Sequence, residues 1–111
     1  MTYKVVKGLE TKDIAARLAY LRNKRGVSAR DMSLSIGQNV GYINNIENEK
    51  TTPSMNGLIY ICEYFGITPS EFFDFDNQNP EKLHDLISDL KKLDDNQLQS
   101  VQSIVKEFLK K

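Results

Sequence analysis

The helical spacing of apolar residues constrains the fold of this chain more than any other sequence feature. Ile14, Leu18 and Leu21 follow one another at intervals of four and three residues, which places them on one face of a helix. Similar stripes recur along the chain, and capping signals at residues 28–31 and 68–71 mark the starts of new helices. No segment alternates apolar and polar residues over the length of a strand. The sequence therefore predicts an all-α fold.

Composition excludes several classes of protein. The 111 residues are 40% hydrophobic and 27% charged, which is typical of a globular protein and not of a disordered chain. No apolar run approaches the roughly 18 residues of a membrane helix, and residues 1–7 lack a signal-peptide core, so we expect a cytoplasmic protein without membrane contacts. One cysteine and one histidine cannot form a disulfide framework or a familiar zinc site. No nucleophile–base pair or phosphate-binding loop is visible, so we expect no metal, no cofactor and no enzymatic activity.

Two parts of the chain differ in their pattern. We expect a flexible N-terminal arm over residues 1–10, a domain of five helices over residues 11–75, and a polar linker over residues 74–79. Residues 76–111 then supply two amphipathic helices, predicted to form a helical hairpin. Two helices of this length cannot enclose a core by themselves, so their apolar stripes must pack on the same subunit or on a second copy of the chain.

The third predicted helix, at about residues 39–48, carries the strongest functional signal. When Ile43 and Ile46 are turned toward the core, the outward positions are Gly41, Asn44, Asn45 and Asn48, with Val40 at the margin. Gly and Asn are weaker helix formers than Ala by roughly 0.5–1 kcal/mol each, so this face does not serve the stability of the helix. An Asn amide donates and accepts at once and can pair with adenine in the major groove. The alternative is a plain solvent-exposed polar face.

Four stretches stand in register along the chain: Ile14-x-x-x-Leu18-x-x-Leu21-Arg22-x-x-x-Gly26-Val27-Ser28, Met32-x-x-x-Ile36-Gly37, Tyr42-Ile43-x-x-Ile46-Glu47-x-x-Lys50-x-x-Pro53-Ser54 and Leu58-x-x-Ile61-x-x-x-Phe65-Gly66-Ile67-x-x-x-Glu71-Phe72-Phe73. Together they resemble the Cro/phage-repressor type of helix-turn-helix regulators, the XRE family. The resemblance implies five helices around one core, with the third helix in the major groove of double-stranded DNA. It further implies a sequence-specific transcriptional regulator that acts as a repressor.

The resemblance also implies roles for individual residues. Base reading falls to Val40, Gly41, Asn44 and Asn45. Phosphate binding falls to Ser28, Arg30, Tyr42, Asn48, Lys50, Thr51 and Thr52. Arg22 and Glu47 align with a pair that is often buried and ion-paired in the family, and such a pair has a structural role.

Three positions depart from the family pattern. Ala29 stands where a glutamine often contacts DNA, and the third helix carries no basic residue, although the family often has one at or near Asn45. Glu49 stands where glycine often lets the chain leave that helix. A carboxylate near phosphates is unfavourable, and a non-glycine residue in the left-handed conformation is strained. These departures leave the fold prediction intact and lower the expected affinity for DNA.

The C-terminal pair of helices resembles appendages that often mediate self-association, at its junction over residues 91–98. A symmetric dimer suits an operator with two half-sites about 10 base pairs apart. We therefore expect a homodimer, in which packing on the same subunit is the alternative. The expected dimerisation residues are Leu83, Leu86, Leu90, Val101, Ile104 and Phe108.

The charge distribution leaves two functional classes open. Fifteen basic and fifteen acidic residues cancel, yet residues 1–37 hold eight basic and three acidic residues, which can face a polyanion. DNA binding is therefore our first hypothesis. The zero net charge, Ala29 and Glu49 favour the second, a protein-interaction module or an antitoxin-like protein that binds a protein partner with the same fold.

Overall fold

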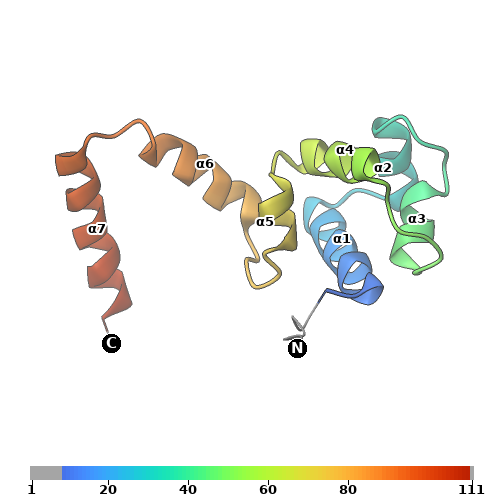
Figure 1. Ribbon diagram of the computed structural model, residues 1–111, viewed down its shortest axis with the longest axis horizontal. Helices are drawn as coiled ribbons and strands as arrows, with labels where there is room; N and C mark the ends of the chain where they lie inside the picture. The colour runs from blue at the N-terminus through green and yellow to red at the C-terminus, as the bar shows by residue number, and fades with distance from the viewer. Residues whose placement is uncertain (1–8, 111) are drawn as a thin grey trace, which may run out of the picture. The chain divides into compact units, whose positions relative to one another are not determined.

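The computed structural model describes residues 9–110, and residues 1–8 and 111 lie outside the described part. Most of the expected N-terminal arm, residues 1–10, is therefore outside it as well. Across the described residues the chain forms seven α-helices and no strand, which confirms the all-α prediction (Figure 1). None of these helices is both long enough and apolar enough to cross a membrane. The chain divides into two compact units at Gln78 and Asn79.

The first unit contains the five helices of the predicted domain. They are α1 (Thr11–Arg25), α2 (Ala29–Ser35), α3 (Tyr42–Glu47), α4 (Met55–Phe65) and α5 (Pro69–Phe73). In Figure 1, α2 and α3 lie together at one side of the unit, and α3 also contacts α1. Helices α1 and α4 both contact α5, which closes the other side.

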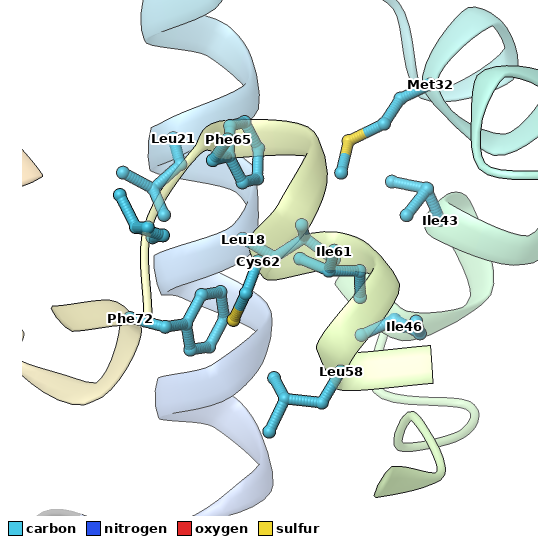
Figure 2. Close-up of a cluster of buried hydrophobic side chains, with 11 residues drawn as sticks. Leu18, Leu21, Met32, Ile43, Ile46, Leu58, Ile61, Cys62, Phe65 and Phe72 are labelled. Carbon is cyan, nitrogen blue, oxygen red and sulfur yellow. The ribbon is translucent and has the colours of Figure 1, made fainter. Parts of the chain in front are cut away.

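One apolar core joins all five helices, as Figure 2 shows. Helix α1 contributes two leucines and α4 the largest share, while α2, α3 and α5 each direct one or two side chains inward. Full burial of one such side chain stabilises the fold by about 1.5–3 kcal/mol. The buried residues of this core are Leu18, Leu21, Met32, Ile43, Ile46, Leu58, Ile61, Cys62, Phe65, Ile67 and Phe72.

Four helices of this unit end in the same way, with one residue in the left-handed conformation. Three of these residues are glycines, Gly26 (φ 74°), Gly37 (φ 75°) and Gly66 (φ 68°). The fourth is Glu49 after α3, with φ 61°. There the Lys50 amide donates to a carbonyl in the last turn of α3 at 2.9 Å, which is the Schellman ending. A side chain at such a position is strained, so the sequence departure at Glu49 has a conformational cost.

The polar segment that follows α5 is anchored to α1, whereas the sequence indicated a linker over residues 74–79. Arg17 on α1 is buried, and its guanidinium donates to three backbone carbonyls, of Phe72 at 2.7 Å, Asn77 at 2.8 Å and Glu71 at 2.9 Å. The Tyr20 hydroxyl donates to the carbonyl of Gln78 at 3.0 Å. Burial lowers the pKa of Arg17, and these carbonyls take the place of water around its charge.

The second unit consists of α6 (Pro80–Leu90) and α7 (Asp95–Leu109). Asp94 and Gln97 form a capping box at the start of α7, with bonds of 2.8 and 3.0 Å. The two predicted helices are both present, joined by a short connection over residues 91–94. No residue of α7 is buried, and Phe108 is 82% exposed. Packing within this unit therefore leaves its apolar stripes uncovered.

Candidate nucleic-acid interface

Helices α2 and α3 and the turn between them form the candidate site. The Ser28 hydroxyl oxygen accepts the amide of Asp31 at 3.0 Å, which caps the start of α2 as the sequence predicts. Helix α3 is shorter than the expected 39–48, because it begins at Tyr42. The side-chain oxygen of Asn39 accepts the amide of Gly41 at 3.1 Å and so closes a turn instead of capping the helix. Val40 and Gly41 therefore lie in the turn that precedes α3.

The four predicted base-reading residues lie on the outer side of this element. Ile43 and Ile46 are buried, with 0% and 1% of their surface exposed, and they point into the core in Figure 2. Asn44 is exposed and Asn45 is half-buried, on the first turns of α3. Val40 is 47% exposed in the turn. The inward and outward faces expected from the helical period are thus the faces that the structure has.

Gly41 leaves the surface of this turn without a projecting side chain. A Cβ atom at this position would lie 3.8 Å from the side-chain oxygen of Asn39 and 3.8 Å from the side-chain nitrogen of Asn45. Both distances are ordinary contacts, so a side chain would fit and would project outward beside Asn45. Glycine here leaves the Asn45 amide accessible to a closely approaching ligand.

The predicted phosphate-binding residues form two groups in the structure. Six of them are exposed at the start of α2 or after α3: Ser28, Arg30, Asn48, Lys50, Thr51 and Thr52. Tyr42 differs, because its ring packs against the core and only part of it is exposed. A Cβ atom on Gly57 of α4 would lie 2.2 Å from the Tyr42 hydroxyl oxygen, so this phenol braces α3 against α4. Burial raises the pKa of Tyr42 above that of an ordinary phenol, which widens the pH range over which its hydroxyl can donate.

Arg22 and Glu47 connect α1 to the last turn of α3. Their side chains form two parallel bonds, from Nε to Oε2 at 2.6 Å and from Nη2 to Oε1 at 2.9 Å. The remaining Nη1 group donates to the carbonyl of Val27 at 2.8 Å. The side chains are 16% and 12% exposed, and the hydrogen bond to Glu47 raises the pKa of Arg22. The charges of Arg22 and Glu47 therefore neutralise each other, and the pair fixes the end of α3.

Ser33 on α2 also holds α3, and sequence reasoning did not single it out. Its side chain is 0% exposed, and its Oγ accepts the amide of Ile43 at 3.0 Å. The hydroxyl proton goes to the carbonyl of Ala29 at 2.7 Å. In the sequence, a serine beside Met32 on a short helix looks like an ordinary solvent-exposed residue. The available signal was the absence of a capping side chain at Gly41, because the first amides of α3 then require an acceptor from elsewhere.

The charges around the candidate site are sparse. Arg30 and Lys50 are the exposed basic residues of the predicted phosphate set, and Glu49 places a carboxylate beside Lys50. Among residues 9–110, no cluster of His, Cys, Asp or Glu could hold a metal ion. The surface is suited to amide and hydroxyl contacts with modest electrostatic attraction.

Comparison with known proteins agrees with this geometry. The profile of a family described as a helix-turn-helix domain matches residues 15–76. The match spans more than half of the chain and includes α2, the turn and α3. No curated protein matches the chain, and no solved structure matches it. On the strength of this match, the chain belongs to the helix-turn-helix domain family.

Proposed function

We propose that the protein is a sequence-specific DNA-binding transcriptional regulator of the Cro/phage-repressor type, which represses by occupying an operator. The observation that carries the proposal is the two-faced α3. Ile43 and Ile46 are buried in the core, while the amides of Asn44 and Asn45 face outward beside Gly41. The position of α3 is fixed from α1, α2 and α4, so these amides are presented on a rigid support.

The chemistry of base recognition follows from these side chains. An Asn amide can donate to N7 and accept from N6 of the same adenine, and such a bidentate pair gives about 1–3 kcal/mol of discrimination. Val40 offers an apolar surface for a thymine methyl group, and Gly41 permits close approach of the backbone. We therefore expect the N-terminal part of α3 and the turn that precedes it to enter the major groove. We also expect these residues to prefer A·T pairs.

Phosphate contacts would come from the exposed residues on both sides of α3. Hydroxyl and amide groups position the protein, whereas Arg30 and Lys50 supply the charge. Each neutralised phosphate contributes about −0.9 to the slope of log K against log salt. Two basic residues per subunit predict a slope of about −2 for one subunit and about −4 for a dimer. This is a shallow dependence for a DNA-binding protein.

We propose further that α6 and α7 mediate homodimerisation. The residues Leu83, Leu86 and Leu90 on α6 repeat at intervals of three and four, and Val101 and Phe108 continue such a stripe on α7. Leu86 is 52% exposed and Ile104 is 55% exposed, so packing within the second unit leaves these stripes uncovered. The stripes of a second copy have the same spacing, and their pairing would give the two-fold symmetry that an operator with two half-sites needs.

The dimer is tested by light scattering coupled to size exclusion. We expect twice the monomer mass for the wild type and a monomer for Ile104→Glu. Ser103→Glu is the matched control. Ser103 is exposed and directly precedes Ile104 in the sequence, but it lies on the face of α7 opposite the apolar stripe. A wild-type monomer at high concentration contradicts the proposal for this unit and leaves the DNA-binding proposal standing.

DNA binding is tested by affinity selection of genomic fragments on the purified full chain, followed by sequencing. We expect enrichment of an inverted repeat with half-sites about one helical turn apart. Asn45→Ala should then weaken binding to the selected site by about 1–3 kcal/mol and relax the preference at one base pair. Asn23→Ala, an exposed asparagine on α1, is the matched control. Unchanged affinity of Asn45→Ala removes that residue from the reading set.

A second function is favoured by the Glu49 carboxylate beside Lys50 and by the zero net charge of the chain. Both features suit a protein-interaction module or an antitoxin-like partner-binding protein with this fold. Failure of the folded full chain to enrich any sequence at modest salt favours that function over DNA recognition.

A further inference from the structure

Helix α3 is too short to position itself. It has six residues, its N-cap is Gly41, and no side chain of its own segment caps its first turn. Short helices are unstable alone because nucleation fixes several residues for each hydrogen bond gained. Two of its six residues are asparagines, which favour turns over helix interiors. The geometry of the reading face therefore depends on contacts from other helices.

Ser33 supplies the missing cap from α2. Its Oγ accepts the amide of Ile43, the second residue of α3, at 3.0 Å. The single hydroxyl proton is directed to the carbonyl of Ala29 at 2.7 Å, which turns a lone pair of the oxygen toward Ile43. With 0% of its surface exposed, Ser33 has no water available as a substitute partner.

These two bonds join the two helix starts of the candidate interface. Ala29 is the first residue of α2, next to the predicted phosphate contacts Ser28 and Arg30. Ile43 is in the first turn of α3, between Gly41 and Asn44. A serine that bonds only the carbonyl one turn back is common and acts locally within its helix. The bond from Ile43 crosses the turn between the helices, so here the same hydroxyl acts between two elements.

We infer that Ser33 is a positioning residue for DNA recognition, which fixes the start of α3 relative to the start of α2 so that base and phosphate contacts form in one register. This inference rests on the proposed function. Loss of the hydroxyl leaves the buried Ile43 amide without an acceptor, and α3 gains freedom at its reading end. Contacts from the flexible Arg30 and Lys50 side chains to phosphates do not require that register. Specific binding should therefore weaken more than non-specific binding.

The test uses the full chain and three variants. Ser33→Ala removes the hydroxyl and keeps a small side chain. Ser35→Ala is the matched control, because Ser35 is an exposed serine on the same helix. Cys62→Ala lowers stability from the part of the core that faces Leu18 and Phe72, away from α3 (Figure 2). Two quantities are measured for each protein: the hydrogen-exchange rate of the Ile43 amide, and the ratio of affinities for the selected site and for a scrambled duplex.

For Ser33→Ala we expect faster exchange at Ile43 and an affinity ratio lowered about five- to tenfold. Ser35→Ala should leave both quantities unchanged. Cys62→Ala should leave the affinity ratio unchanged, although it should lose as much stability as Ser33→Ala or more. An unchanged Ile43 exchange rate in folded Ser33→Ala overturns the cap. An unchanged ratio, or an equal loss of ratio in Cys62→Ala, overturns the role in recognition.

Failure of the proposed function gives a different result. In that case the wild type itself shows no preference for any selected site, which overturns DNA recognition and the role of Ser33 in it together. The exchange measurement needs no DNA, so it still decides whether Ser33 caps α3. If Ser33→Ala does not fold, Ser33→Cys keeps a weak sulfur acceptor at the same position. The Ile43 amide of Ser33→Cys should then exchange faster than in the wild type and in Ser35→Ala, and its affinity ratio should be lower than theirs. Wild-type values for both quantities overturn the inference.

Discussion

Replacement of Glu49 by glycine should stabilise this protein. Glu49 has φ 61° at the end of α3, where the three equivalent helix endings have glycine at φ 68–75°. A non-glycine residue in this conformation costs about 1–2 kcal/mol. Glycine removes that cost but gains freedom in the unfolded chain, which costs about 0.4–1 kcal/mol. The expected net gain is about 0.5–1 kcal/mol in the free energy of unfolding.

A second helix ending in the same unit, at Gly66, provides an independent check of this magnitude. Gly66 ends α4 with φ 68°, and a Cβ atom there would have no neighbour within 4 Å. Gly66→Ala therefore adds conformational strain without a steric clash, and the same two effects apply with opposite sign. We expect it to lower the free energy of unfolding by about 0.5–1 kcal/mol. Glu49→Ala should stay within about 0.5 kcal/mol of the wild type, because the side chain is exposed and the strain remains.

Urea denaturation followed by tyrosine fluorescence is the appropriate assay. The tyrosines among the described residues are Tyr20, Tyr42, Tyr60 and Tyr64, and all lie in the first unit, so their signal reports on that unit and not on α6 or α7. The transition midpoint should rise for Glu49→Gly and fall for Gly66→Ala at an unchanged denaturant slope. The reasoning is refuted if Glu49→Gly is no more stable than Glu49→Ala while Gly66→Ala is destabilised as expected.

Three other changes have outcomes that the contacts determine. Glu47→Ala leaves the Arg22 guanidinium largely buried without its carboxylate and should cost about 3 kcal/mol by urea titration; an isosteric Glu47→Gln that costs as much argues against a role for charge. Arg17→Met removes the donor from three backbone carbonyls and should also cost about 3 kcal/mol, with loss of amide protection just after α5. Burial raises the pKa of the Cys62 thiol to about 11 from its ordinary value of 9.0. The folded state therefore holds this proton longer than the unfolded state, so the stability contributed by the neutral thiol is complete below pH 9 and should be lost between pH 9 and 11. Cys62→Ala should therefore remove the fall in the free energy of unfolding between pH 9 and 11. If the fall remains in this variant, the Cys62 thiol is not its cause.

Local signals account for most of the fold that could be predicted. The caps at Ser28, Thr68 and Asp94 are each a residue type and a partner three positions later, so they are complete within one helical turn. The inward direction of Ile43 and Ile46 follows from the helical period, which fixes both faces of α3 at once. These features depend on neighbours in the chain, and for that reason the sequence is sufficient to predict them.

The support of the candidate site depends on residues that are distant in sequence. The bond from the Ile43 amide to Ser33, the approach of Tyr42 to Gly57 and the bonds of Arg17 beyond α5 all require packed helices. No residue type or spacing announces them, because serine, tyrosine and arginine are also common on surfaces. For a similar reason, the sequence predicted a start of α3 that lies too far toward the N-terminus. Asn39 can cap a helix or close a turn, and the hydrogen bond to Gly41 decides for the turn.

The sequence by itself determined the all-α class, the order of the helices and the two faces of α3, because periodicity and capping act within a few residues. Tertiary structure decided what holds that helix in place. Helix α3 is held by a buried serine on α2, by a tyrosine that packs against α4 and by an ion pair to α1. Burial in a shared core makes such contacts obligatory, since a polar group without water must find its partner in another helix.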